Sequence, residues 1–224
     1  MKLPGLTLGL RWLPVLLLFV PLSLHGQGRI SYVLGEVELL RGGRAMLADI
    51  GQELSAGDRV RTGSDGTAII ELRNGTQLKL RENTLLDLDQ LEGRVEVELQ
   101  QGSLFSRVER AVGRGYRVRT GPVVAGVRGT EFFVAYGRTV DEAPDVWLCV
   151  NDGAVEVAVE GSDESVVVNE GEGVNILASE RITKPRFYPW TEGLNWNMSP
   201  EAGEVRDATD LDQAYSDLLD QDYD

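Results

Sequence analysis

The chain has 224 residues, with 22 basic and 36 acidic side chains and a formal net charge of −14. A protein with this much negative charge is repelled by nucleic acid and by anionic lipid surfaces. We therefore expect that the whole chain binds neither DNA nor RNA. A single cysteine excludes an intramolecular disulfide, and a single histidine leaves little room for histidine chemistry.

The N-terminal segment has the layout of a secretory signal peptide. Lys2 and Arg11 supply positive charge, and an apolar run at residues 12–24 precedes the small residues Gly26 and Gly28. The run is too short to cross a bilayer comfortably, which takes about 20 residues. We therefore expect an exported protein, periplasmic or secreted, that is cleaved after Gly26 or Gly28. Retention of the segment as a signal anchor is the alternative.

Removal of a signal peptide at residues 1–26 also removes His25, so the mature chain has no histidine. This excludes Ser-His-Asp and Cys-His catalysis and every histidine-based metal site. Cys149 lies in the apolar run 146–150, where a buried, unreactive thiol is expected. We therefore expect a protein that is not an enzyme, with no catalytic residues, no metal and no cofactor.

Residues 33–180 have the pattern of short β-strands separated by turns. Each strand candidate alternates apolar and charged side chains, as expected where one face lies in a core and the other in solvent. The clearest examples are 35–39, 76–81, 94–99, 116–120 and 154–159. With about fourteen candidates at short spacing, the pattern indicates an all-β sandwich, barrel or solenoid-like roll.

An internal repeat favours the roll of stacked short strands. The sequence Arg-Val-Arg-Thr-Gly occurs at residues 59–63 and again at 117–121, and Gly-Thr pairs follow at 66–67 and 129–130. Repeated β-units that share one core are typical of solenoids. Chance similarity between strands rich in glycine and valine is the alternative.

Residues 185–224 differ in composition and form an aromatic linker followed by an acidic tail. Leu211, Tyr215, Leu218 and Leu219 have helical spacing, so we expect a short amphipathic helix, capped by Asp207 or Thr209. The four linker aromatics are Phe187, Tyr188, Trp190 and Trp196. They could stack on sugar rings or anchor a partner, but we favour a clamp that holds the C-terminal segment on its own domain.

A group of arginines between residues 102 and 138 is the other candidate binding feature. It includes Arg107, Arg110, Arg114, Arg117 and Arg119. Arginines on one face could bind an anionic glycan, a phosphate group or an acidic partner segment. They could equally dock the acidic tail of the same chain or form a solvated strand face.

Several segments together resemble the FecR domain. The resemblance extends over residues 33–178 and is most specific in the block 123–134, which contains Val127, Arg128, Gly129 and Thr130. For Arg128 we favour a structural role over ligand contact. The resemblance implies an all-β, solenoid-like periplasmic module without catalytic residues. In membrane-bound relatives this module relays a signal from an outer-membrane receptor to a cytoplasmic sigma factor.

The chain departs from those relatives because it has no N-terminal cytoplasmic helical segment, so no direct contact with a sigma factor is expected. We expect a periplasmic interaction scaffold or signal sensor that binds another envelope protein. A binding protein for anionic cell-wall or surface glycan is the alternative.

Overall fold

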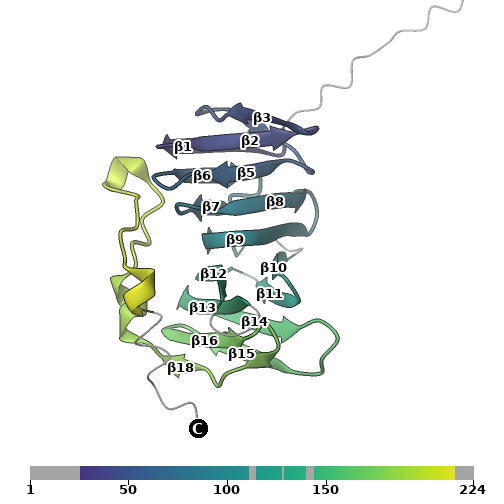
Figure 1. Ribbon diagram of the computed structural model, residues 1–224, viewed down its shortest axis with the longest axis vertical. Coiled ribbons are helices and arrows are strands. Elements are labelled where there is room, and N and C mark those ends of the chain that lie inside the picture. Colours follow the sequence, from purple (N-terminus) through teal and green to yellow (C-terminus); the bar gives the residue numbers. More distant parts are fainter. Residues whose placement is uncertain (1–25, 111–114, 128, 140–143, 215–224) are drawn as a thin grey trace, which may run out of the picture.

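The computed structural model describes residues 26–110, 115–127, 129–139 and 144–214. They form two β-sheets stacked face to face in an elongated body, with the first strands at one end and the last at the other (Figure 1). Within these ranges, none of the helical segments has the length and hydrophobicity that a membrane span requires.

The two sheets are here named A and B. Sheet A contains β1 (Gly28–Leu34), β4 (Glu53–Leu54), β6 (Thr67–Leu72), β7 (Gln77–Leu80), β12 (Glu131–Thr139), β13 (Pro144–Asp152), β16 (Glu172–Leu177), β17 (Arg181–Ile182) and β18 (Arg186–Phe187). Sheet B contains β2 (Val37–Arg41), β3 (Arg44–Leu47), β5 (Arg59–Thr62), β8 (Leu85–Gln90), β10 (Tyr116–Thr120), β11 (Val123–Val127), β14 (Ala154–Val159) and β15 (Ser165–Asn169). The long strand β9 (Val95–Arg107) joins both, its first half in sheet B and its second half in sheet A.

The predicted all-β architecture is confirmed, whereas a solenoid is not. Neighbouring strands are antiparallel, except for β9 and β10, which are parallel. A solenoid of regular coils would instead pair successive layers in parallel throughout. The sheets are not closed: within the described ranges, β3 pairs only with β2 and β15 pairs only with β14.

The main core lies between the sheets and follows from the alternation in the sequence. In β9, Val95, Val97 and Leu99 are buried, while Glu96 and Glu98 between them face outward. Because successive side chains of a strand point to opposite faces, each amphipathic strand gives its apolar half to this core. The repeated strands β5 and β10 both lie in sheet B, with their valines buried and their arginines outward.

A second hydrophobic cluster covers the outer face of sheet A. Its sheet residues include Ile69, Phe105, Phe133 and Trp147, which point away from the main core. They are covered by residues 188–214, here named the strap, which run along one side of the stack (Figure 1). Outward-facing positions of sheet A are therefore largely buried.

The strap is mostly irregular. It contains two 3₁₀ turns, η1 (Pro189–Gly193) and η2 (Pro200–Ala202), and a helical turn at residues 211–214. The cap of this helical turn is Asp210, whose Oδ1 accepts the N–H groups of Asp212 and Gln213, each at 3.0 Å. The sequence-based choice of Asp207 or Thr209 was wrong, because Asp207 points into the domain. The rest of the predicted helix lies outside the described residues.

Candidate interaction surfaces

Lys79 on β7 is a fully buried cation beneath the strap. Its Nζ donates hydrogen bonds to the backbone carbonyls of Asn195 and Asn197, the latter at 3.0 Å. It also lies 4.2 Å from the centre of the Phe105 ring, within the range of a cation–π contact. Burial lowers the pKa of Lys79 to about 8, and the attraction of Asp207 only partly offsets this effect. The strand pattern predicted a solvent-facing lysine, which is wrong because the strap covers it.

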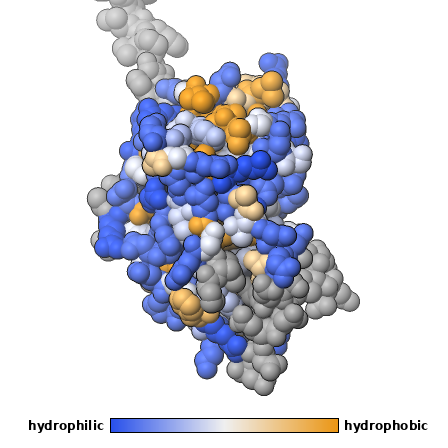
Figure 2. All heavy atoms as spheres, turned by 90° about the vertical axis from the view of Figure 1, so that its left-hand side faces the viewer, coloured by the Kyte–Doolittle hydropathy of each residue, from blue (hydrophilic) through white to orange (hydrophobic). Residues whose placement is uncertain are grey.

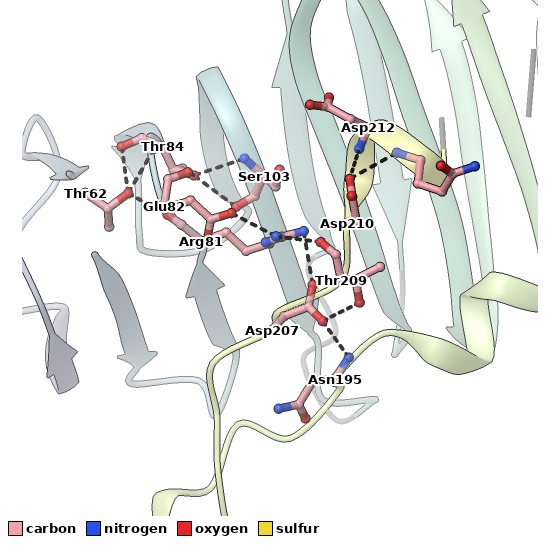
Figure 3. A network of polar contacts seen from close by, with 11 residues as sticks. Thr62, Arg81, Glu82, Thr84, Ser103, Asn195, Asp207, Thr209, Asp210 and Asp212 are labelled. Atoms are coloured by element: carbon pink, nitrogen blue, oxygen red, sulfur yellow. Dashed lines mark hydrogen bonds and ion pairs between the residues drawn. The ribbon is translucent and has the colours of Figure 1, made fainter. Parts of the chain in front are cut away.

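A second buried cation, Arg81, holds the returning part of the strap (Figure 3). It forms an ion pair with Asp207 at 3.1 Å and donates to the carbonyl of Thr209 at 3.0 Å. The side chains of Arg81 and Asp207 are only 6% and 1% exposed. Desolvation offsets much of the attraction in a buried pair, while loss of one partner is costly. We infer that this pair fixes where the strap docks more than it adds net stability.

The two passes of the strap are tied to each other by asparagine side chains. The amide of Asn195 donates to the carbonyls of Glu204 and Arg206, both at 2.9 Å, and the amide of Asn197 donates to Glu204 at 3.1 Å. The N–H of Asn195 also donates to Asp207 at 3.0 Å. The strap therefore docks as one folded unit instead of a loose tail.

Two of the predicted linker aromatics pack on the domain itself. Trp196 meets Phe105 edge-on, with ring centres 5.2 Å apart, and Tyr188 is fully buried. Gly173 in β16 makes room for Tyr188, because a Cβ there would lie 2.7 Å from the tyrosine ring. Phe187, by contrast, is 60% exposed. The side chain of Trp190 lies outside the described residues.

The structure distributes the arginine group over opposite sides of the molecule. Arg107, in sheet A, donates to Glu131 at 2.9 Å and to the carbonyl of Trp196 in the strap at 3.1 Å. Arg117 and Arg119 lie on the outer face of sheet B, where they pair with the glutamates of β9 at 3.1 and 3.9 Å. These arginines therefore do not form one patch.

The remaining members of the group are peripheral. Arg110 is exposed and pairs with Asp152 at 3.1 Å, while Arg114 lies outside the described residues. Sequence spacing could not show this separation, because it depends on where β9 crosses from one sheet to the other.

The Val127–Thr130 block lies at a corner between the sheets. Val127 is buried at the end of β11, and the hydroxyl of Thr130 donates to the carbonyl of Ala154 at 3.0 Å. Gly129 has φ of +73°, and a Cβ there would lie 2.8 Å from Cα of Arg110. Glycine alone relieves both constraints. Arg128 lies outside the described residues.

The outer surface of the strap is acidic. Its exposed carboxylates belong to Glu192, Glu201, Glu204, Asp210 and Asp212. The only basic residue of the strap is Arg206, which is also exposed. The strap thus presents a net negative surface on the side of the molecule that faces the viewer in Figure 2, which is largely hydrophilic.

A feature that the sequence interpretation missed is an apolar surface at the end formed by the first strands. Six large hydrophobic residues are exposed among those described, and four of them lie here: Leu34, Met46, Leu47 and Ile50. Figure 2 shows hydrophobic atoms gathered at this end. We name these four residues the apolar end. The only sequence signal was a strand, Arg44–Leu47, that lacks the usual polar alternation.

Among the described residues, neither a metal-binding cluster nor an exposed cysteine is present. In the described ranges, no group of three or more His, Cys, Asp or Glu residues is placed to hold a metal ion. Cys149 is fully buried, as predicted, and burial raises the pKa of its thiol, so the reactive thiolate is disfavoured.

Comparison with solved structures supports the fold. Two structures from Parabacteroides distasonis ATCC 8503, each described as a "putative anti-sigma factor", are 21% identical to this chain. The 1.65 Å structure has a TM-score of 0.49 and matches 58% of this chain and 59% of its own, so the chain spans less than two thirds of it. The 2.50 Å structure has a TM-score of 0.50 and matches 64% of this chain and 69% of its own.

No curated protein matches the chain. The model of one family, described as FecR protein, matches residues 58–172, which include the repeated strands and the Val127–Thr130 block. This match covers just over half of the chain, and the chain therefore belongs to the FecR family.

Proposed function

We propose that this protein is a non-enzymatic interaction module of the bacterial envelope, which takes part in signalling by binding another envelope protein through the strap. The observation that carries the proposal is the way residues 188–214 are held. Buried Lys79 and Arg81 contact backbone carbonyls of the strap, so its path does not depend on its exposed side chains. The outward carboxylates are then available to recognise a partner.

The chemistry of that surface defines the partner. A rigid, net negative strap fits a basic protein surface, and charge complementarity contributes to specificity and to the rate of association. Pre-ordering of the strap also lowers the entropy that binding would cost. The expected partner is therefore an envelope protein with a lysine- and arginine-rich contact surface.

Family membership and the N-terminal segment support the same role. FecR relatives and the anti-sigma description of the two similar structures point to signalling through protein partners. The signal-peptide layout supports export, periplasmic or secreted, which would separate the chain from a cytoplasmic sigma factor.

The glycan alternative has weaker support. It relies on arginines that could bind anionic sugars, but Arg117 and Arg119 already pair with Glu96 and Glu98. Paired guanidinium groups attract an external anion less strongly than free ones do. Two linker aromatics, Tyr188 and Trp196, are packed against the domain and offer no stacking platform.

The test is photo-crosslinking in native cells. A photoreactive amino acid replaces Ala208, an exposed residue of the strap, and adducts are identified by mass spectrometry. We expect one dominant envelope protein, whose capture is lost in the E192K/E204K double variant and weakens as salt increases. The matched control is D89K/E92K, two exposed acids on the side of sheet B, which should leave capture unchanged.

Two results would contradict the proposal. Capture that persists in E192K/E204K would remove the strap from recognition. Recovery of polysaccharide without a protein adduct would favour glycan binding.

A further inference from the structure

The edge strand β3 presents free backbone groups at the apolar end. The hydrogen bond from the N–H of Ala48 to the carbonyl of Val37, at 2.9 Å, sets which β3 groups bond to β2. With the register of Leu39 opposite Met46, the N–H and C=O groups of Ala45 and Leu47 point away from β2. No other strand in the described ranges pairs with this edge, so it is open to an added strand.

The side chains along this edge are apolar on both faces. Leu47 lies on the outer face, opposite Glu38, and is 72% exposed. Met46 lies opposite the fully buried Leu39, on the core side, yet it is 40% exposed because none of the described residues forms a layer over this end. Ile50, in the turn that follows, is 66% exposed. Apolar edge strands are normally protected from pairing with other chains. An exposed apolar edge of this kind therefore indicates that a partner strand binds here.

We propose that the partner is a second copy of this chain, which adds its β3 antiparallel to the first across a twofold axis. Sheet B then continues from one copy into the other, and the two apolar ends pack together. Such a contact is isologous, the commonest arrangement of homodimers.

Charge complementarity favours a second copy of this chain as the partner. Arg44 begins β3 and Asp49 follows its end, and both side chains are exposed and form no ion pair within the described residues. An antiparallel twofold pairing brings Arg44 of each copy toward Asp49 of the other, giving two complementary contacts.

The opposite end of sheet B is a poorer candidate. Its edge strand β15 exposes Val167 but is flanked by Asp163, Glu164 and Glu170. Two copies of this edge would therefore repel each other. The contact through β3 does not use the strap glutamates Glu192 and Glu204 that the crosslinking experiment changes, although Ile50 and the strap residue Glu201 line one surface pocket.

The first measurement is sedimentation velocity on protein purified from cells that express the full chain, at concentrations of about 1 to 100 µM. We expect a dimer that dissociates on dilution. L47E should be monomeric, and its melting temperature should equal that of the wild type at concentrations where the wild type is also monomeric, because Leu47 is exposed in the monomer. A45P, which removes an N–H from the free edge, should also weaken dimerisation. The matched control V167E should remain dimeric.

The second measurement identifies which edges meet. Under mild oxidation, M46C should form a disulfide-linked homodimer, because Met46 lies midway between Arg44 and Asp49 and therefore near the proposed axis, whereas V167C should not. A heterodimer from mixed M46C and V167C would instead indicate head-to-tail pairing of β3 with β15. That result, a monomeric wild type throughout the concentration range, or loss of the dimer in V167E would overturn the proposal.

Discussion

The burial of Lys79 predicts an unusual dependence of stability on pH. Its pKa in the folded protein is about 8, against an ordinary value of 10.5, because burial disfavours the charged form. Below pH 8 both the folded and the unfolded chain hold the proton. Between pH 8 and 10.5 only the unfolded chain holds it, so the free energy of unfolding contributed by this group rises with pH.

The size of this effect follows from the shift of the pKa. A difference of 2.5 pKa units, at 1.36 kcal/mol each, gives a gain of roughly 3 kcal/mol between pH 7 and pH 10.5. Replacement of Lys79 by Met keeps an apolar chain of similar length but removes the charge. It also removes the hydrogen bonds to the strap carbonyls, which adds an offset that does not vary with pH.

The assay is urea unfolding of the wild type and K79M at intervals from pH 7 to 10.5. The measured quantity is the difference in unfolding free energy between the two proteins. Tyr116 and Cys149, whose pKa values are raised by burial, titrate in both proteins and therefore cancel in the difference. The wild type should gain about 3 kcal/mol relative to K79M over this range.

A matched control is available because Lys184 is exposed. K184M should follow the wild type at every pH. If the difference between the wild type and K79M stayed constant across the range, Lys79 would not be a buried cation, and the account of the docked strap would fail.

Three further predictions concern the strap and the N-terminus. D207A removes the buried one of the two carboxylates that pair with Arg81, the other being the more exposed Glu82, and should cost about 3 kcal/mol in urea unfolding, whereas alanine at an exposed aspartate should cost little. G173V places a side chain where the ring of Tyr188 packs, and should expose the strap to limited proteolysis while the β-sheets keep their circular dichroism. If the signal peptide is removed, mass spectrometry should find a mature chain that retains Gln27. The backbone of this residue forms hydrogen bonds with β4 and with the turn after β6. A mature chain that begins after Gln27 would contradict this prediction.

Much of the β-structure could be predicted from local sequence. Alternation at residues 94–99 and 116–120 predicted strands correctly, because side chains of a strand alternate between two faces whatever the rest of the fold does. The burial of Cys149 and the change in composition near residue 185 could also be predicted from the sequence, since both are properties of short segments.

The binding surfaces were harder to predict because they depend on contacts between distant segments. Lys79 and Arg81 occupy the polar positions of an alternating strand, a pattern typical of a solvated face. They are buried because residues 188–214 fold back over that face, more than 100 positions later in the chain. The alternation of apolar and polar residues predicts which face of the strand a side chain occupies. It does not predict which other segment covers that face.

The strands, their inward faces and membership of the FecR family could be predicted from the sequence, since these depend on periodicity and on short motifs. That Arg107 contacts the strap while Arg117 lies on the opposite sheet could be found only from the folded structure, because β9 crosses between sheets before it reaches Arg107. The same is true of the edge of β3, which no other described strand pairs with. An unpaired edge is a property of the whole sheet, defined by which strands lie beside it in space.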